Sequence, residues 1–157
     1  MLLLMGTIRC LSIVVTKKAV DFLEKADRML PTMNANFFEL KGKTITSIVG
    51  INPNDEQTVI TTSDGTVYTL EHYQDCCEDV RVYNTVGKID DVLNEEVIVA
   101  EDDNPMDNPN AIGYVVDSCK TNTWTNFRIV TNKGAFEIWW LGESRGYSED
   151  VSVSKNK

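Results

Sequence analysis

The sequence predicts a single α+β domain, with a mainly antiparallel sheet of about six to eight strands, an N-terminal helix and one short helix. Three observations lead to this class. A chain of 157 residues is long enough to bury a core without disulfides or metal. From residue 42 onward, short alternating segments are separated by turn residues, which is typical of strands joined by hairpins. Helical periodicity is concentrated near the N-terminus, so helices and strands are segregated along the chain.

The N-terminal part of the chain predicts a buried strand over 2–15, followed by a helix over 17–30 with apolar residues at helical spacing. The first apolar run is interrupted by Arg9 and lacks a basic start and a cleavage site, so we do not expect a signal peptide. It is also shorter than the roughly 20 apolar residues that span a bilayer, so we expect no membrane contact. We divide the chain into an N-terminal extension, 1–38, and an antiparallel domain, 39–157.

The remaining elements follow from alternation and turn signals. Asp64-Gly65 predicts a hairpin with a type I′ turn, whose two central residues need positive φ. Asn132-Lys133-Gly134 predicts a second hairpin, and a short helical turn is expected over 88–94. The acidic segment 101–113 contains two prolines and predicts a solvated loop. The predicted strands are Lys43–Ile51, Gln57–Ser63, Thr66–His72, Val80–Val86, Glu96–Glu101, Thr123–Thr131, Ala135–Leu141 and 150–154.

The charge is unevenly distributed. Residues 1–32 carry five basic and three acidic side chains, whereas the other 125 residues carry ten and twenty-one, a net charge of −11. So acidic a body repels nucleic-acid phosphates, which argues against direct DNA or RNA binding. The same charge suits either a basic partner surface or simple solubility.

The segment His72–Asp79, HYQDCCED, concentrates chemistry-bearing side chains, including the only histidine of the chain. Three carboxylates surround Cys76 and Cys77 and would raise a thiol pKa, which disfavours a cysteine nucleophile. In a helix, His72, Asp75 and Cys76 would share one face, and Cys119 could complete a metal site. The alternative is a structural corner, with one cysteine of the pair packed in the core.

The four cysteines do not predict a disulfide framework, and a reduced intracellular protein is the simpler interpretation. The Cα atoms of Cys76 and Cys77 are about 3.8 Å apart, below the usual range for a disulfide. On a strand or helix, adjacent side chains also point in different directions.

Two further features stand near the C-terminus. Trp139 and Trp140 point to opposite faces of one strand, so one of them is expected to be partly exposed or covered by the N-terminal helix. Gly142–Tyr147 predicts a tight turn or a close approach by another backbone or a ligand, and Arg145 could hold an anion there. We expect this turn and the HYQDCCED segment to lie at the same end of the sheet, with Glu143 or Tyr147 near His72.

Three sequence blocks carry a resemblance to a known family: ELKGKTITSI (39–48), HYQDCCED (72–79), and TWTNF with KGAFEIWWLGESRGYSEDVSV (within 123–153). Together they resemble a small domain of unknown function encoded by bacteriophages and prophages, whose members share HYQDCCE and GES-x-GY runs. The resemblance covers about 39–153. It implies an accessory protein acting in the cytoplasm of an infected bacterial host, and it supplies no catalytic residue. Residues 1–32 are either a native extension or the product of a start upstream of Met33.

These observations leave two hypotheses, and neither fixes the oligomeric state. The first is a non-enzymatic phage accessory protein, without a cofactor, that binds a bacterial host protein, for example to inhibit it or to counter host defence. Its contacts would involve Trp139 or Trp140, Tyr147 and the 142–147 turn. The alternative is a small-ligand or metal-binding domain, enzymatic or not. Its site would be built on His72, Asp75, Cys76, Cys77, Glu78 and Glu143.

Overall fold

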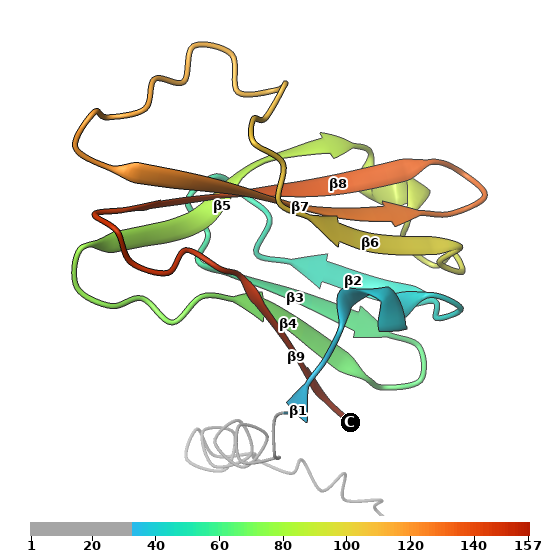
Figure 1. Ribbon diagram of the computed structural model, residues 1–157. Coiled ribbons are helices and arrows are strands. Elements are labelled where there is room, and N and C mark those ends of the chain that lie inside the picture. The colour runs from blue at the N-terminus through green and yellow to red at the C-terminus, as the bar shows by residue number, and fades with distance from the viewer. Residues whose placement is uncertain (1–32) are drawn as a thin grey trace, which may run out of the picture. The chain divides into compact units, whose positions relative to one another are not determined.

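The computed structural model describes residues 33–157, and within them it is an all-β sandwich (Figure 1). Over residues 33–157, nine strands form two antiparallel sheets, and helical structure is limited to the 3₁₀ segments η1 (Phe37–Leu40) and η2 (Ile89–Asp91). The predicted α+β class is therefore wrong. The expected short helix over 88–94 is a single 3₁₀ turn that Asn94, at φ 60°, does not continue. The predicted strand 2–15 and helix 17–30 lie outside the described residues.

The two sheets are stacked one over the other (Figure 1). The five-stranded sheet has the order β1-β9-β4-β3-β2, and the four-stranded sheet has the order β5-β8-β7-β6. The strands are β1 (Met33–Asn34), β2 (Ile45–Val49), β3 (Gln57–Thr62), β4 (Val67–Glu71), β5 (Glu78–Gly87), β6 (Val99–Asp103), β7 (Thr121–Val130), β8 (Ala135–Ser144) and β9 (Ser152–Asn156).

The eight predicted strand segments correspond to β2–β9, which confirms the antiparallel sheet expected from the alternation. The two-residue strand β1 gave no periodic signal. β6, β7 and β8 form a meander, and β5 returns beside β8, so the four-stranded sheet is a Greek key. Within the described residues, the chain passes between the sheets twice, from β4 to β5 and from β8 to β9.

The Asp64-Gly65 hairpin is present, but its predicted type I′ turn is wrong. The Thr62 amide donates to the Thr66 carbonyl at 2.9 Å, and the Gly65 amide donates to the Thr62 carbonyl at 3.0 Å. Only Gly65 of this turn has positive φ, which fits a type I turn closed by a glycine bulge. The Asp64 carboxylate accepts the Thr62 hydroxyl and the Thr66 amide, which stabilises the three-residue connection.

The main core lies between the sheets, because both sheets turn their apolar alternate positions toward each other. The five-stranded sheet contributes Ile45, Ile48, Ile60, Tyr68 and Leu70, and the four-stranded sheet contributes Val80, Val82, Ala100, Phe127, Ile129, Phe136, Ile138 and Trp140. Phe37 of η1 is also buried, and its ring packs edge-on against Phe127 at 4.9 Å. Residues 33–38 belong to the same compact unit as the sheets, since they contribute β1 and Phe37 to it.

A second apolar cluster covers the outer face of the four-stranded sheet. Trp124, Trp139 and Leu141 are its buried centre, and Tyr83, Val86, Ala111 and Tyr114 pack against them. Both adjacent tryptophans are therefore buried: Trp140 in the main core and Trp139 in this outer cluster. The expected exposure of one tryptophan is wrong, because the connection between β6 and β7 supplies Ala111 and Tyr114 as a cover. No helix within residues 33–157 is long and apolar enough to cross a membrane.

Candidate functional site

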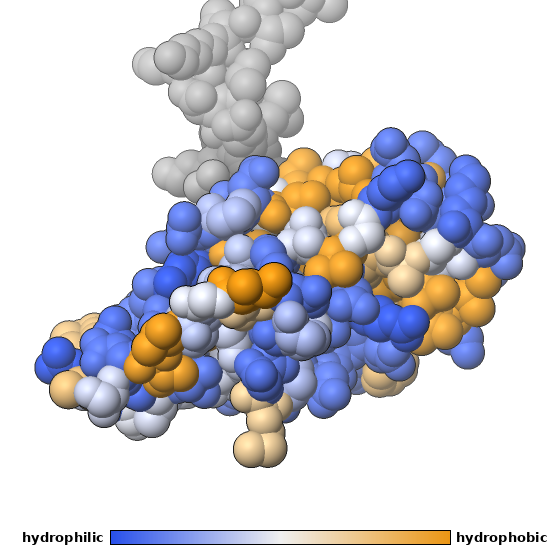
Figure 2. Space-filling view, turned by 90° about the horizontal axis from the view of Figure 1, so that it is seen from above, coloured by the Kyte–Doolittle hydropathy of each residue, from blue (hydrophilic) through white to orange (hydrophobic). Residues whose placement is uncertain are grey.

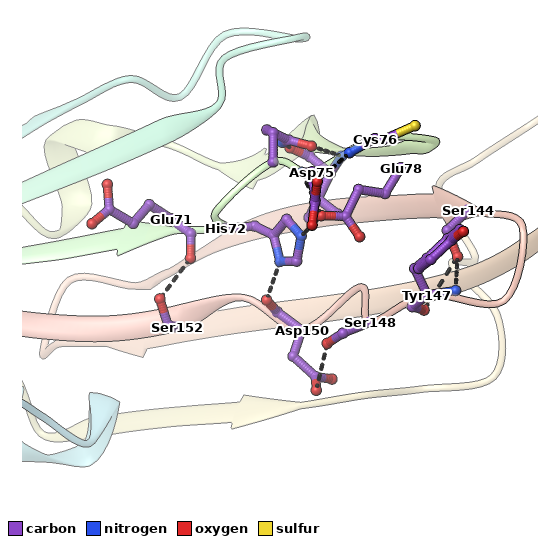
Figure 3. Close-up of polar contacts among 12 residues, drawn as sticks. Glu71, His72, Asp75, Cys76, Glu78, Ser144, Tyr147, Ser148, Asp150 and Ser152 are labelled. Atoms are coloured by element: carbon purple, nitrogen blue, oxygen red, sulfur yellow. Dashed lines mark hydrogen bonds and ion pairs between the residues drawn. The ribbon is translucent and has the colours of Figure 1, made fainter.

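The HYQDCCED segment forms the crossover from β4 to β5 and lies beside the crossover from β8 to β9 (Figure 3). Glu78 pairs with Ser144 in the sheet, and the Ser152 hydroxyl donates to the Glu71 carbonyl at 2.8 Å. The prediction that the two polar segments meet at one end of the sheet is therefore confirmed. We call this junction, residues 71–80 with 142–152, the crossover corner.

His72 ties the two crossovers together. Its Nδ1 lies 2.7 Å from the Asp150 carbonyl, and its Nε2 lies 2.9 Å from Glu78 Oε1 (Figure 3). The side chains of His72 and Glu78 are only 8% and 5% exposed. No hydrogen bond among the described residues joins His72 to Glu143 or Tyr147, so neither of the two residues expected near His72 is its hydrogen-bond partner. Asp150 takes their place, and nothing in its sequence context marks its carbonyl oxygen as a histidine partner.

The two partners of His72 are both acceptors, so both ring nitrogens must donate, which requires the imidazolium cation. Burial of the ring lowers the pKa of His72. The hydrogen bonds to Asp150 and Glu78, together with the negative charge of Glu78, outweigh the burial and raise the pKa above its ordinary value of 6.5. When His72 is protonated, the crossover corner therefore contains a buried ion pair between His72 and Glu78.

The other polar groups of the segment are also occupied. Glu78 Oε1 accepts the Asp75 amide at 2.6 Å, in addition to His72. The Gln74 side-chain amide donates to the Val80 carbonyl, and its oxygen accepts the Val80 amide at 3.2 Å. These two hydrogen bonds fasten the β4–β5 crossover to the start of β5. The segment is a corner whose polar groups satisfy one another.

The expectation that one cysteine of the pair packs in the core is wrong, because both Cys76 and Cys77 are exposed. Neither fills the core, where Val80 and Val82 of the following strand stand instead. Cys77 has φ 72°, in the left-handed region, and this turns the two side chains toward each other. Their Sγ atoms are 2.9 Å apart. The hydrogen bond and electrostatic interaction with Cys77 raise the pKa of Cys76, with smaller contributions from desolvation and Asp75.

The metal site considered from the sequence does not assemble in this corner. Its ligands would be His72, Asp75, Cys76 and Cys119, but both nitrogens of the His72 ring already contact protein oxygens. Within residues 33–157, no three histidine, cysteine or acidic side chains are grouped so that they could hold a metal ion.

The 142–147 segment is partly strand and partly turn, since β8 continues to Ser144. A Cβ atom at Gly142 would lie 2.6 Å from the Cβ of Glu149, so this glycine permits the close approach predicted from the sequence. Glu149 is buried, and its carboxylate accepts the Thr121 hydroxyl at 2.8 Å. Ser144 bonds both backbone groups of Tyr147, which leaves the Tyr147 side chain 57% exposed.

Glu143 connects the corner to the connection between β6 and β7, residues 104–120. Its carboxylate accepts Arg81 at 3.0 Å on one oxygen and the Tyr114 hydroxyl at 3.0 Å on the other. Burial and then the hydrogen bond to Glu143 raise the pKa of Tyr114 to about 12. The Tyr114 ring packs edge-on against Trp124 at 5.3 Å and against Tyr83 at 6.0 Å. Sequence reasoning missed Tyr114, although an aromatic residue in a polar, acidic loop is a recognisable signal.

The same connection exposes apolar side chains on its other side. Asn108 is 3% exposed and its side-chain amide donates to Asn84 of β5 at 3.5 Å, so the connection is held at a second point besides Tyr114. Four large apolar side chains nevertheless stand in solvent: Met106 (100% exposed), Ile112 (94%), Val115 (83%) and Val116 (44%). We call these four residues the loop face. Figure 2 looks down on this side of the sandwich and shows apolar groups among charged and polar ones.

A family comparison identifies the chain. The sequence profile of a family described as a domain of unknown function (DUF7448) matches residues 38–153. The chain belongs to this family. The match includes the crossover corner and the loop face, and it begins within one residue of the first block that carried the resemblance. No curated protein and no solved structure matches the DUF7448 chain significantly.

Proposed function

We propose that this DUF7448 protein is a non-enzymatic phage accessory protein that binds a bacterial host protein through its loop face. The observation that carries the proposal is the exposure of Met106, Ile112, Val115 and Val116 on a connection whose base is buried. Exposed apolar side chains gathered on one segment are typical of protein contact surfaces.

The anchoring of the connection supports binding rather than simple mobility. Ala111 packs into the outer cluster beside Ile112, and the Tyr114 hydroxyl is held by Glu143. The exposed side chains therefore alternate with partly buried anchors along the same few residues. A segment that is already ordered loses less conformational entropy on binding, so more of the contact energy becomes affinity.

Charge indicates the chemistry of the partner. Asp102, Asp103, Asp107 and Asp117 stand on β6 and in the connection, and the chain from residue 33 onward has a net charge of −11. An apolar patch with an acidic surround fits an apolar patch ringed by lysine and arginine. The expected partner is a host protein with such a basic-rimmed surface.

The polar groups of the crossover corner support a non-enzymatic role. The histidine, carboxylate and amide groups there bond one another, so none is left poised toward an open space for a substrate. The phage assignment, and action in the cytoplasm of an infected bacterium, rest on the HYQDCCED and GES-x-GY runs. Inhibition of the partner or counter-defence is the role expected of such a binder.

A paired-variant binding experiment tests the proposal. The full chain is used to capture partners from bacterial lysate, and the captured protein is then purified for titration. The double variant Ile112→Ser with Val115→Ser should weaken binding about tenfold or more, since apolar contacts of this kind contribute on the order of 1–2 kcal/mol. Val49→Ser, which removes a 55% exposed valine from β2, is the matched control and should bind normally. Equal binding by both variants would overturn the proposed surface.

A further inference from the structure

The cysteine pair of the crossover corner has a geometry that a structural turn does not require. The Cys76 and Cys77 sulfurs are 2.9 Å apart, about 0.9 Å longer than an S–S bond of about 2.05 Å. Both side chains are exposed, so a small reagent can reach them. The left-handed backbone of Cys77 brings the sulfurs together, although L residues rarely adopt it without a reason.

We propose that Cys76 and Cys77 form a reversible thiol–disulfide site, which closes into a vicinal disulfide on reaction with a small-molecule disulfide. This inference is independent of the proposed binding function. The sequence predicts that these adjacent cysteines are poor disulfide partners because their Cα atoms are close together, yet the positive φ of Cys77 accompanies sulfurs only 2.9 Å apart.

The reaction balances in two exchange steps. The thiolate of one cysteine attacks the small disulfide, forms a mixed disulfide and releases one small thiolate. The second cysteine, as its thiolate, then attacks the protein sulfur of the mixed disulfide, forms the Cys76–Cys77 bond and releases the second small thiolate. The protein loses two protons and two electrons, and the small disulfide is reduced to two thiols.

Reversibility follows from the chain geometry. Adjacent Cα atoms are about 3.8 Å apart, shorter than the usual separation in disulfides, and such deviations store strain that makes the bond easier to reduce. Strained, exposed disulfides are the labile ones, whereas structural disulfides resist reduction. The pair therefore suits switching and not permanent stapling.

Hydrogen bonds of the surrounding loop fix the backbone that carries the two thiols. The Asp75 amide is bonded to Glu78, and Gln74 is bonded in both directions to Val80. The Asp75 carboxylate accepts the Cys76 amide at 2.7 Å. Each of these bonds lies within three residues of the pair. Because the thiols are pre-positioned, the second exchange step is intramolecular and fast relative to attack by another small thiol.

Cys119 supplies a matched control within the same chain. It is also exposed, but it lies in the connection between β6 and β7, away from the pair in the sequence. The full chain is incubated with glutathione disulfide at pH 8.5, until Cys119 is fully modified, and peptides are then mapped by mass spectrometry. The peptide with Cys76 and Cys77 should lose two hydrogen atoms and carry no glutathione, whereas the Cys119 peptide should gain one glutathionyl group.

Two further measurements sharpen the test. In Cys77→Ser, the remaining Cys76 should keep a glutathionyl group, as Cys119 does. The wild-type pair should return to thiols in excess reduced glutathione. The oxidation should accelerate as the pH rises, because the attacking species is the thiolate, and the raised pKa of Cys76 shifts this rise to higher pH. A stable glutathionyl group on the wild-type pair, a bond to another chain, or an unreacted pair beside modified Cys119 would each overturn the inference.

Discussion

Two regions of this sandwich carry its unusual residues, the crossover corner and the connection between β6 and β7. The two regions differ in which kind of side chain they expose. At the crossover corner, His72 bonds both Glu78 and the Asp150 carbonyl, and the His72 and Glu78 side chains are buried. At the loop face, Ile112 and Val115 are exposed although they are apolar. The corner thus buries a polar pair, whereas the connection from β6 to β7 exposes apolar side chains.

This contrast distinguishes unusual residues that the fold requires from unusual residues that the fold does not explain. The corner contains both crossovers between the sheets, and His72 joins them through its bonds to Glu78 and to the Asp150 carbonyl. The connection between β6 and β7 joins neighbouring antiparallel strands. Two residues would suffice for this, yet the connection has residues 104–120. The corner is explained by the fold, whereas the length and exposure of the connection are not, and the proposed binding surface lies on the connection.

The largest expected effect on stability is at the corner. His72→Ala removes one partner of a buried pair and leaves the Glu78 carboxylate uncompensated, which should lower the free energy of unfolding by about 3 kcal/mol. Urea denaturation measures this loss. Tyr73→Ala, at the neighbouring 88% exposed position, is the control and should change stability by less than about 0.5 kcal/mol. Equal losses in the two variants would remove the distinction between corner and surface.

The pH dependence of the corner is the next largest effect. The folded state raises the pKa of His72 above 6.5, so the ion pair stabilises the protein fully below pH 6.5. Its contribution is lost as the pH rises through the folded pKa, because the folded state then gives up the proton it had held more tightly. The difference in stability between wild type and His72→Gln should therefore shrink from pH 6 to pH 9. A constant difference over this range would mean that His72 acts without its charge.

Much of the sandwich could be predicted from the sequence, because alternation and turn residues are local signals. The strands β2 to β9 were located, and so was the meeting of the two polar segments at one end. The sandwich class, the burial of Trp139 and the convergence of Cys76 and Cys77 were not predicted. Trp139 is covered by residues about 25 positions away, and the cysteine pair depends on one positive φ value. Such features depend on tertiary contacts that leave no periodic signal.

A smaller effect should come from the anchor that links the two regions. Tyr114→Phe keeps the ring against Trp124 but removes the hydroxyl that donates to Glu143, which should cost about 1 kcal/mol. The loss should be local, so limited proteolysis should cut within 104–120 faster while the global unfolding midpoint shifts little. Tyr147→Phe, at an exposed side chain, is the control and should leave the cleavage rate unchanged. Equal cleavage rates in the two variants would mean that the hydroxyl does not hold the connection.

The smallest expected effect on stability is at the loop face itself. Ile112→Ser replaces a side chain that is 94% exposed, so folding gives it little burial to lose, and the free energy of unfolding should change by less than about 0.5 kcal/mol. Differential scanning calorimetry of the two purified proteins measures this. The neighbouring Ala111 packs into the outer cluster, and Ala111→Ser should destabilise more, because it places a hydroxyl among apolar side chains. If Ile112→Ser were the more damaging of the two, Ile112 would be packed against its own domain and the loop face would not be free to meet a partner. If Ile112→Ser leaves the free energy of unfolding unchanged but weakens capture of the host protein, Ile112 contributes to binding and not to stability.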